Sequence, residues 1–363
     1  KTKTMLRKLY LFAAVAALPF SASAQTSTES KPAEEKKSNF TFTGSVDGYF
    51  RSDFSQTASN NRTSFTNSSG KLALGMISGK VDYASGKFSA TADLGAGKRA
   101  KEFAYNDKGI LSYVKQLNVA FAATDWLKFT AGTWATHVGY ELVDAYANRN
   151  YSMSYMFSYG PFLHTGLKSD ITLGSTGLMI GIANPTDYRK APEGNKKSLL
   201  LQVSQAITDD IKVYVNYVGG QRPADEAKIR QFDLVLTAKL NDQFNIGYNG
   251  TVNSTALKVS GAYADAKTWS GSAVYLNYDP AKKFGITLRS EMFSDKYQLS
   301  ALGTATSGGS LFANTLSGNV KLGGLTIIPE IRFESSNSKI FFNKNGTASQ
   351  SNGSFLVALA YKF

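Results

Sequence analysis

Apolar and polar side chains alternate along sixteen successive segments of this chain, and the pattern fills most of residues 40–363. An alternation with a period of two residues predicts β-strands whose two faces meet different surroundings. Each segment spans about ten residues, the length that a tilted strand needs to cross a lipid bilayer. The segments cover residues 40–54, 72–84, 87–98, 110–123, 126–140, 163–173, 177–184, 198–207, 211–219, 229–240, 243–252, 267–278, 284–296, 310–322, 325–335 and 353–363. The chain is therefore predicted to be all-β, with strands of transmembrane length.

The connections between the segments alternate strictly between short and long. Tight turns are expected at 85–86, 124–125, 174–176, 208–210, 241–242, 279–283 and 323–324. Longer stretches lie near 55–71, 99–109, 141–162, 185–197, 220–228, 253–266, 297–309 and 336–352. Seven turns and eight loops join sixteen antiparallel strands when both ends of the chain lie on the tight-turn side. Bacterial outer-membrane barrels combine an even strand number with short periplasmic turns and long external loops. We therefore predict a transmembrane antiparallel β-barrel of about 16 strands, in the outer membrane of a Gram-negative bacterium.

The two faces of a segment differ in the way that a barrel in lipid requires. In "FGITLRSEMF", Phe284, Ile286 and Leu288 share one face, whereas Arg289 and Glu291 share the other. Charged side chains need water or a partner, so the charged face is predicted to line a wet lumen. A soluble barrel with its apolar face turned inward is the alternative. Sixteen strands leave room for an aqueous bore.

Three local features qualify the strand pattern. The final segment, "FLVALAYKF", ends on the aromatic Phe363, which suits a last strand paired with the first and an aromatic side chain at the membrane interface. This ending resembles the signal by which the outer-membrane assembly machinery recognises Gram-negative barrels, so that machinery is an expected partner. Segment 72–84 changes phase near Ile77 and Ser78. Pro329 lies inside a predicted strand, where its missing N–H predicts a bulge.

The first 38 residues differ from the rest of the chain. Arg7 and Lys8 precede an apolar run over residues 9–20, and Ala22 and Ala24 form an A-x-A cleavage pattern. This pattern predicts a cleavable signal peptide, with upstream residues, over 1–24. A disordered periplasmic tether over 25–38 and the barrel over 39–363 are expected to follow. Loss of the four basic residues of 1–24, which holds no acidic residue, lowers the net charge from +13 to +9. The basic residues are dispersed, so nucleic-acid binding is not expected.

Several stretches carry a family resemblance. "FTGSVDGYFRSDF", "AGTWATHVGYE" and "NYSMSYMFSYGPFLHTGLKSD" are similar to stretches of the OmpL-like β-barrel porins common in Bacteroidetes-type outer membranes. The resemblance is best over the first half of the chain, and beyond residue 200 it depends on the barrel pattern. It implies an outer-membrane pore and names no ligand.

The longest loop is the candidate pore constriction. Residues 141–162 are rich in aromatic residues, and they also carry Glu141, Asp144 and Arg149. In general porins the third external loop folds into the lumen and narrows it. By analogy these three charges would face Asp47, Arg51, Arg289 and Glu291 on the wall. An external aromatic collar at the lipid surface is the alternative.

Five lysines on the lumen side lie close to a tight turn or to the end of the chain: Lys128, Lys212, Lys239, Lys321 and Lys362. They predict a ring of positive charge at the periplasmic mouth, which would give a weak preference for anions. Solvation of the rim is the plainer interpretation.

Catalysis has little material in this chain. There is no cysteine, and the only histidines are His137 and His164. No sequence pattern links either of them to a nucleophile, and no zinc, calcium or phosphate-loop motif is present, so no cofactor or metal is expected. "GAGKRA" at 95–100 resembles a phosphate loop, but we expect it to end a strand and to lead into a loop, not a helix.

The function predicted from the sequence is that of a porin. We expect a passive diffusion channel for small hydrophilic solutes, embedded in outer-membrane lipid as a monomer or a homotrimer. A plugged structural or adhesin-type barrel and a barrel hydrolase are the alternatives. Channel conductance would separate the pore from the plugged barrel, and substitution of His164 would test the hydrolase.

Overall fold

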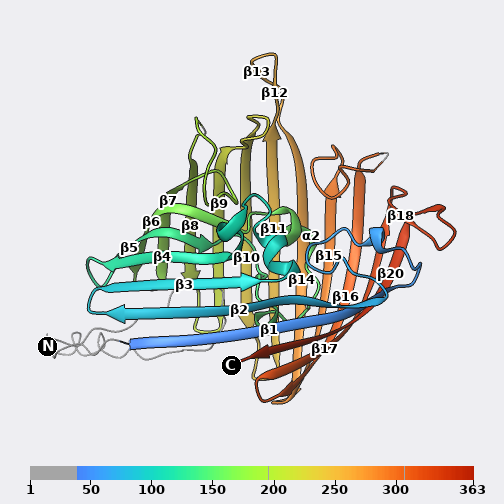
Figure 1. Ribbon diagram of the computed structural model, residues 1–363, viewed down its shortest axis with the longest axis horizontal. Helices are drawn as coiled ribbons and strands as arrows, with labels where there is room; N and C mark the ends of the chain where they lie inside the picture. The colour runs from blue at the N-terminus through green and yellow to red at the C-terminus, as the bar shows by residue number, and fades with distance from the viewer. Residues whose placement is uncertain (1–38, 195, 306) are drawn as a thin grey trace, which may run out of the picture.

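The computed structural model describes residues 39–194, 196–305 and 307–363. The predicted signal peptide (1–24) and tether (25–38) lie outside these residues. Sixteen strands close into one antiparallel barrel, in which each strand pairs with its neighbours in the chain and β20 pairs with β1 (Figure 1). The predicted fold class and strand number are thus confirmed.

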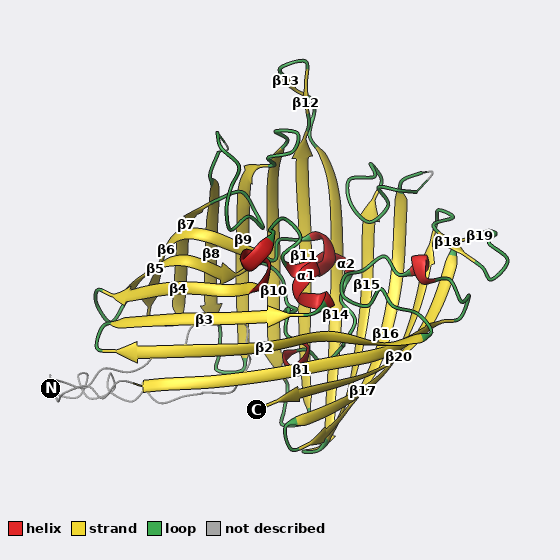
Figure 2. Cartoon of the chain, viewed as in Figure 1, coloured by secondary structure: helices red, strands yellow, loops and turns green. Residues whose placement is uncertain are grey.

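The barrel strands are β1 (Asn39–Asp53), β2 (Lys71–Ser85), β3 (Phe88–Ala96), β4 (Val114–Ala122), β5 (Leu127–Ala135), β6 (Leu163–Leu173), β7 (Thr176–Ala183), β8 (Ser198–Ala206), β9 (Ile211–Gln221), β10 (Lys228–Lys239), β11 (Phe244–Ala256), β14 (Lys267–Ala281), β15 (Phe284–Asp295), β16 (Gly309–Leu322), β17 (Leu325–Ser336) and β20 (Ser351–Lys362). The small hairpins β12 (Lys258–Val259) with β13 (Ala262–Tyr263), and β18 (Phe341–Phe342) with β19 (Ala348–Ser349), extend two long loops. Two short α-helices, α1 (Lys98–Phe103) and α2 (Tyr155–Tyr159), and the 3₁₀ turns η1 (Ala58–Asn60), η2 (Gly109–Tyr113) and η3 (Ala145–Ala147) lie in the long loops (Figure 2).

Most predicted segments overlap the observed strands to within a few residues. The fourth strand begins at Val114 and not at residue 110, because η2 occupies residues 109–113. The fifth ends at Ala135 and not at residue 140, because the chain turns inward there. No helix in the described part of the chain is long and apolar enough to span a membrane.

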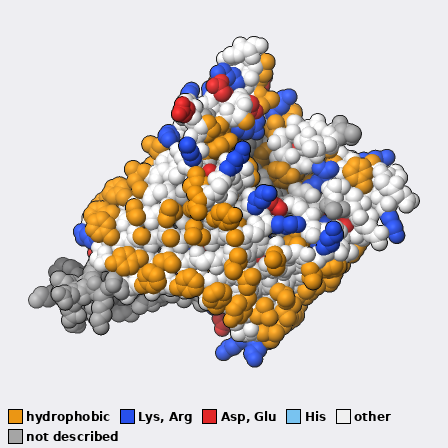
Figure 3. Space-filling view, in the orientation of Figure 1, with side chains coloured by type: hydrophobic (Ala, Val, Ile, Leu, Met, Phe, Trp, Pro, Cys, Tyr) orange, Lys and Arg blue, Asp and Glu red, His pale blue; other side chains and the backbone are white. Residues whose placement is uncertain are grey.

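The apolar face of the strands points outward. Met292 is 60% exposed, whereas its neighbour Glu291 is fully buried inside the barrel. Apolar side chains cover much of the outer wall (Figure 3). The soluble alternative, with its apolar face inward, is therefore wrong.

Two outward tyrosines lie along their own strands toward the long-loop end. A Cβ added at Gly219 would lie 2.2 Å from the Oη of Tyr217, and one added at Gly250 would lie 2.6 Å from the Oη of Tyr248. In both β9 and β11 the glycine two residues further on therefore leaves the space that the tyrosine ring and hydroxyl occupy.

A bulge in β2 explains the change of phase in that strand. The register with β1 shifts by one residue between the pairs Val46 with Ile77 and Gly48 with Leu74. Leu74 and Ile77 both remain on the lipid side, with exposed fractions of 78% and 59%. The bulge thus keeps the apolar residues outside although their spacing changes from two to three.

Pro329 does not form the predicted bulge. The register of β17 continues unbroken on both of its sides, and Pro329 itself pairs with Val357 of β20. On the β16 side the proline ring lies against Gly318, which has no side chain to meet it. The small neighbour accommodates the ring and the strand stays regular.

Candidate pore constriction

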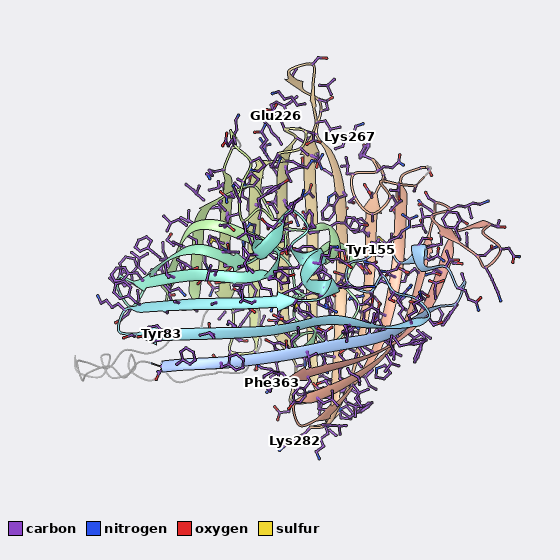
Figure 4. All side chains as sticks on the ribbon, in the orientation of Figure 1. Tyr83, Tyr155, Glu226, Lys267, Lys282 and Phe363 are labelled. Carbon is purple, nitrogen blue, oxygen red and sulfur yellow. The ribbon has the colours of Figure 1, made fainter. Side chains whose placement is uncertain are left out.

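The loop between β5 and β6, residues 136–162, lies inside the barrel. We call this segment the lumen loop. Its side chains Tyr151, Met153 and Tyr155 are fully buried. Their contacts, described below, are with wall residues of β1, β15 and β17. In Figure 4 the labelled Tyr155 lies within the outline of the strands. The loop therefore fills much of the lumen and does not form an external collar.

One buried arginine of the wall binds the loop at several points. Arg289, on β15, places Nη1 2.5 Å from a carboxylate oxygen of Glu141. The same guanidinium donates hydrogen bonds to the carbonyls of Ser152 (2.7 Å) and Met153 (3.2 Å) and to the hydroxyl of Thr315 (3.2 Å). A charge held away from water needs several such partners, because each unmet donor costs free energy. Arg289 therefore fastens both ends of the segment 141–153.

The two other predicted loop charges also pair with the wall. Asp144 lies 2.6 Å from the ammonium group of Lys115, which comes from β4. Arg149 forms a bidentate ion pair with Asp279 of β14, at 2.6 and 3.0 Å. Each of Glu141, Asp144 and Arg149 therefore meets an opposite charge, and little of their charge remains uncompensated in the lumen.

Wall carboxylates also hold the backbone of the loop. Glu330 accepts a hydrogen bond from the N–H of Tyr151 (2.9 Å), and Glu291 accepts one from the N–H of Met156 (3.1 Å). The hydroxyl of Tyr151 donates to Asp47 at 2.5 Å. These three acids therefore hold residues 151–156 of the loop against β1, β15 and β17.

Two buried arginines of the wall differ in what they bind. Arg51 forms its ion pair with Asp53, two residues further along β1, at 3.1 Å, and not with the lumen loop. Arg332 of β17, which is not among the predicted constriction residues, donates a hydrogen bond to the carbonyl of Met153 at 2.9 Å. Both arginines are buried on the inner side of the wall, but strand parity carries no information about which part of the loop lies at each depth.

The "GAGKRA" stretch leads into helix α1, so the expectation of a loop after it is wrong. Arg99 of this helix is fully buried, with its guanidinium carbon 4.9 Å from the ring centroid of Phe65 and 4.6 Å from that of Tyr151. Its Nε lies 3.7 Å from Asp47. These contacts give α1 a packing role against the lumen loop.

A small cavity lies between the lumen loop and the wall strands β10 and β11. Its volume is about 10 Å³, and its lining residues include Phe157, Gln231, Asp233 and Thr251. That volume is about what one water molecule needs. Nearer the tight turns, the lumen-facing side chains of Gln202, Ser204, Tyr214 and Thr237 are only partly buried. The lumen is thus tight at the loop and wider toward the tight-turn end.

The five predicted lysines differ in their surroundings. Lys239 pairs with Asp242 at 2.7 Å, and Lys128 lies 3.9 Å from Asp170. The remaining three, which are exposed and form no ion pair within the described residues, are Lys212, Lys321 and Lys362. Of the five lysines, these three therefore contribute most of the uncompensated positive charge.

The two histidines lie together, with ring centroids 5.3 Å apart. His137 Nε2 lies 3.3 Å from the carbonyl of Tyr217, and His164 Nε2 lies 3.1 Å from the hydroxyl of Thr136. Burial lowers the pKa of His137 to about 4, so it is neutral at physiological pH. Among the described residues no hydrogen bond joins either ring to a serine or a carboxylate, and no group of acidic and histidine side chains could hold a metal.

An external loop fastens the far end of the lumen loop. Asp187, between β7 and β8, accepts hydrogen bonds from the backbone N–H groups of Phe162 (2.7 Å) and Leu163 (2.9 Å) and from the hydroxyl of Tyr105 (2.8 Å). Burial raises the pKa of Asp187 to about 6, against the opposing effect of these bonds and of nearby Arg189.

Known proteins share this architecture. The family described as "Putative beta-barrel porin-2, OmpL-like" matches residues 39–363. OmpT, an outer membrane protein of Vibrio cholerae, superposes with a TM-score of 0.58 at 13% identity, covering 90% of this chain and 98% of that chain. OmpF of Salmonella typhi in complex with daunomycin gives 0.57 at 11% identity, covering 91% and 98%. A mutant of the Rh. blastica porin gives 0.51 at 9% identity, covering 90% and 100%. At these identities the structures establish the fold alone. No protein with a curated description matches the sequence.

Proposed function

This chain belongs to the OmpL-like β-barrel porin family, whose match covers residues 39–363, and on that premise we propose that it is a passive diffusion channel for small hydrophilic solutes. It is an outer-membrane barrel. The observation that carries the proposal is the lumen loop, which narrows a sixteen-stranded barrel from within. A barrel of this size without such a loop would leave a wide aqueous bore.

The loop also supports a proposal about what passes. Because the docked loop fills much of the lumen with buried side chains, it restricts passage to small solutes. Larger solutes require the loop to shift away from the wall. We therefore propose a narrow pore whose conductance depends on how firmly the loop is docked.

The charges favour a weak preference for anions. The three loop charges are paired with wall charges, so the loop adds little net field. Lys212, Lys321 and Lys362 remain unpaired among the described residues at the tight-turn mouth and raise the local anion concentration there. The effect is modest, because the Debye length is about 8 Å at physiological salt.

The chain is proposed to be a channel without catalytic activity. Within the described residues, neither ring of the buried histidine pair is hydrogen-bonded to a serine or to a carboxylate, so the nucleophile and the acid of a hydrolase are not assembled around them. The proposal also includes export through the signal peptide at 1–24, insertion by the assembly machinery through the last strand, and a monomeric or homotrimeric state.

Bilayer recording tests the pore. Purified barrel should give discrete conductance steps, and proteoliposomes should swell in small sugars but not in large ones. A barrel that inserts, migrates as a folded heat-modifiable species and yet gives neither steps nor swelling is a plugged scaffold, and the channel proposal would then be wrong.

Two matched pairs of substitutions test the anion preference. Lys212→Gln with Lys321→Gln removes two unpaired charges, whereas Lys128→Gln with Lys239→Gln removes two that have acidic neighbours. The Lys212 and Lys321 double variant should move the reversal potential in a salt gradient toward zero, and the Lys128 and Lys239 double variant should move it less. Equal shifts, or a cation preference in the unaltered protein, would reject the role of these lysines.

A further inference from the structure

A shallow pocket of about 220 Å³ lies where β9 and β10 approach the long-loop end of the barrel. The cross-strand pairs Gly219 with Arg230 and Gln221 with Lys228 line it. By the alternation of the strands, these residues share the outer face of the wall with Phe232, which is 59% exposed. The pocket therefore opens on the lipid side, outside the lumen.

The pocket is strongly basic. Its cationic side chains are Lys196, Lys197, Lys228 and Arg230. None of its described lining residues is acidic, and none of the four cations forms an ion pair within the described part of the chain. The nearest acidic residues in the adjoining loop are already engaged, because Asp225 pairs with Arg222 and Glu226 pairs with Lys258. Four positive charges therefore converge here without a protein counter-ion.

Two tyrosines shape the pocket. The hydroxyl of Tyr217 occupies the space above Gly219, where a Cβ would lie 2.2 Å from it. Tyr263, from the β12–β13 hairpin that projects from the barrel in Figure 1, lies over the other side, with its ring centroid 3.8 Å from Lys228 Nζ. Gly219 and Gly220 also line the pocket, and neither has a side chain to fill it. The site thus combines hydroxyl donors and cations around a pocket that two glycines help to keep open.

The height of the pocket on the wall identifies its surroundings. Directly below it, Tyr217 and Phe232 pair across the strands with ring centroids 4.9 Å apart. Aromatic residues on the lipid face of a barrel are enriched at the boundary between hydrocarbon and headgroups. In Figure 4 the labelled Glu226 and Lys267 mark this end of the barrel, and Lys282 marks the opposite end. The four cations therefore lie at headgroup level.

We propose that this pocket binds the phosphate groups of a phosphorylated lipid of the outer leaflet. Lysine and arginine are the side chains that recognise phosphate through charge-assisted hydrogen bonds, and clustered basic residues beside a membrane bind anionic headgroups. The acyl chains of such a lipid would lie on the apolar wall below, over Phe232 and Leu234. A soluble phosphate compound would gain nothing from that wall.

The test measures retention of a defined lipid by the folded, full-length barrel. Vesicles of phosphatidylcholine alone and vesicles that also contain diphosphoryl lipid A serve as probes, and native mass spectrometry after extraction counts the bound lipid A. Lys228→Gln with Arg230→Gln should weaken binding about thirtyfold, since each basic residue near an anionic surface contributes about fivefold. The matched control, Lys282→Gln with Lys283→Gln, removes two exposed lysines at the opposite end and should bind as the unaltered protein does.

Two further variants guard against a folding artefact. Lys196→Gln with Lys197→Gln alters only an external loop and should also weaken binding about thirtyfold. Gly219→Val keeps all four charges but displaces Tyr217, and it should weaken binding as well. Single-channel conductance of all pocket variants should equal that of the unaltered barrel, because the pocket lies outside the lumen; the pore proposal is thus tested separately.

Two results would overturn the proposal. One is equal retention of lipid A by the control pair and by both charge-removing pairs. The other concerns an amine-acylating reagent applied to the pocket lysines. If inorganic pyrophosphate protected these lysines from the reagent and lipid A in vesicles did not, the pocket would be a site for soluble phosphates.

Discussion

Replacing Arg289 with methionine should release the lumen loop. The guanidinium forms the ion pair with Glu141 and binds the carbonyls of Ser152 and Met153. Methionine fills a similar volume but offers none of these donors. The carboxylate of Glu141 would then stay buried without its cation, or the loop would leave the wall to hydrate it.

The size of the effect follows from the burial of this pair. The side chains of Arg289 and Glu141 are only 1% and 5% exposed. Removing one partner of a buried pair costs roughly 3–5 kcal/mol. Since 1.4 kcal/mol is a factor of ten, the ratio of docked to undocked loop should fall about a hundredfold to several thousandfold. Adding Glu141→Gln should restore part of the loss, because no ionised group is then left unpaired.

Two assays report on the loop. Arg289→Met should raise mean conductance and open-channel noise in bilayers, and it should expose Arg149, inside the loop, to cleavage by trypsin. The control is Arg222→Met, because Arg222 and Asp225 are 44% and 41% exposed and such a surface pair contributes at most about 1 kcal/mol. If Arg289→Met matched this control in both assays, the loop would not depend on the pair and the reasoning would fail.

Three further predictions concern other parts of the molecule. Because burial raises the pKa of Asp187 to about 6, its contribution to loop docking should be full below about pH 4 and lost as the pH rises through 6. Hydrogen-exchange protection at the start of β6 should fall over that pH window, and Asp187→Asn should abolish the change. In this cysteine-free chain, Asn345→Cys in a long loop should react with a membrane-impermeant maleimide on intact cells and Asp209→Cys in a tight turn should not; the reverse result would invert the topology. Phe363→Ser removes an aromatic side chain that is 59% exposed, next to the pairing of β20 with β1, and it should lower the amount of heat-modifiable barrel in outer membranes. Wild-type abundance would show that this residue is dispensable for assembly.

The barrel was predictable because its signal is local and repeated. A period of two residues in a chain with alternating short and long connections leaves few other folds, and each strand adds an independent observation. The bulge in β2 was visible only as a change of phase. At the bulge, Gly75 leaves space that the side chain of Asp47 on the neighbouring strand occupies, a contact between strands that alternation within one strand does not reveal. Pro329 misled because a neighbour without a side chain, Gly318, removes the need for a bulge.

The site was predictable in composition but not in pairing. Glu141 and Arg289 were both expected at the constriction, and the structure places them 2.5 Å apart. The partner of Arg149 was not foreseen, because Asp279 lies at the end of β14, where strand parity gives little guidance. Which wall residue meets which loop residue depends on how deep the loop descends, and that depth is set by many contacts acting together.

The two glycine-backed tyrosines have a consequence for the bilayer around the barrel. Tyr217 and Tyr248 lie along their strands over Gly219 and Gly250, and both point toward the long-loop end. A ring held in such a slot cannot easily swing to follow a membrane of another thickness. Mismatch in hydrophobic thickness on this side should therefore be met by the lipids, through local thinning or stretching, or by a tilt of the whole barrel.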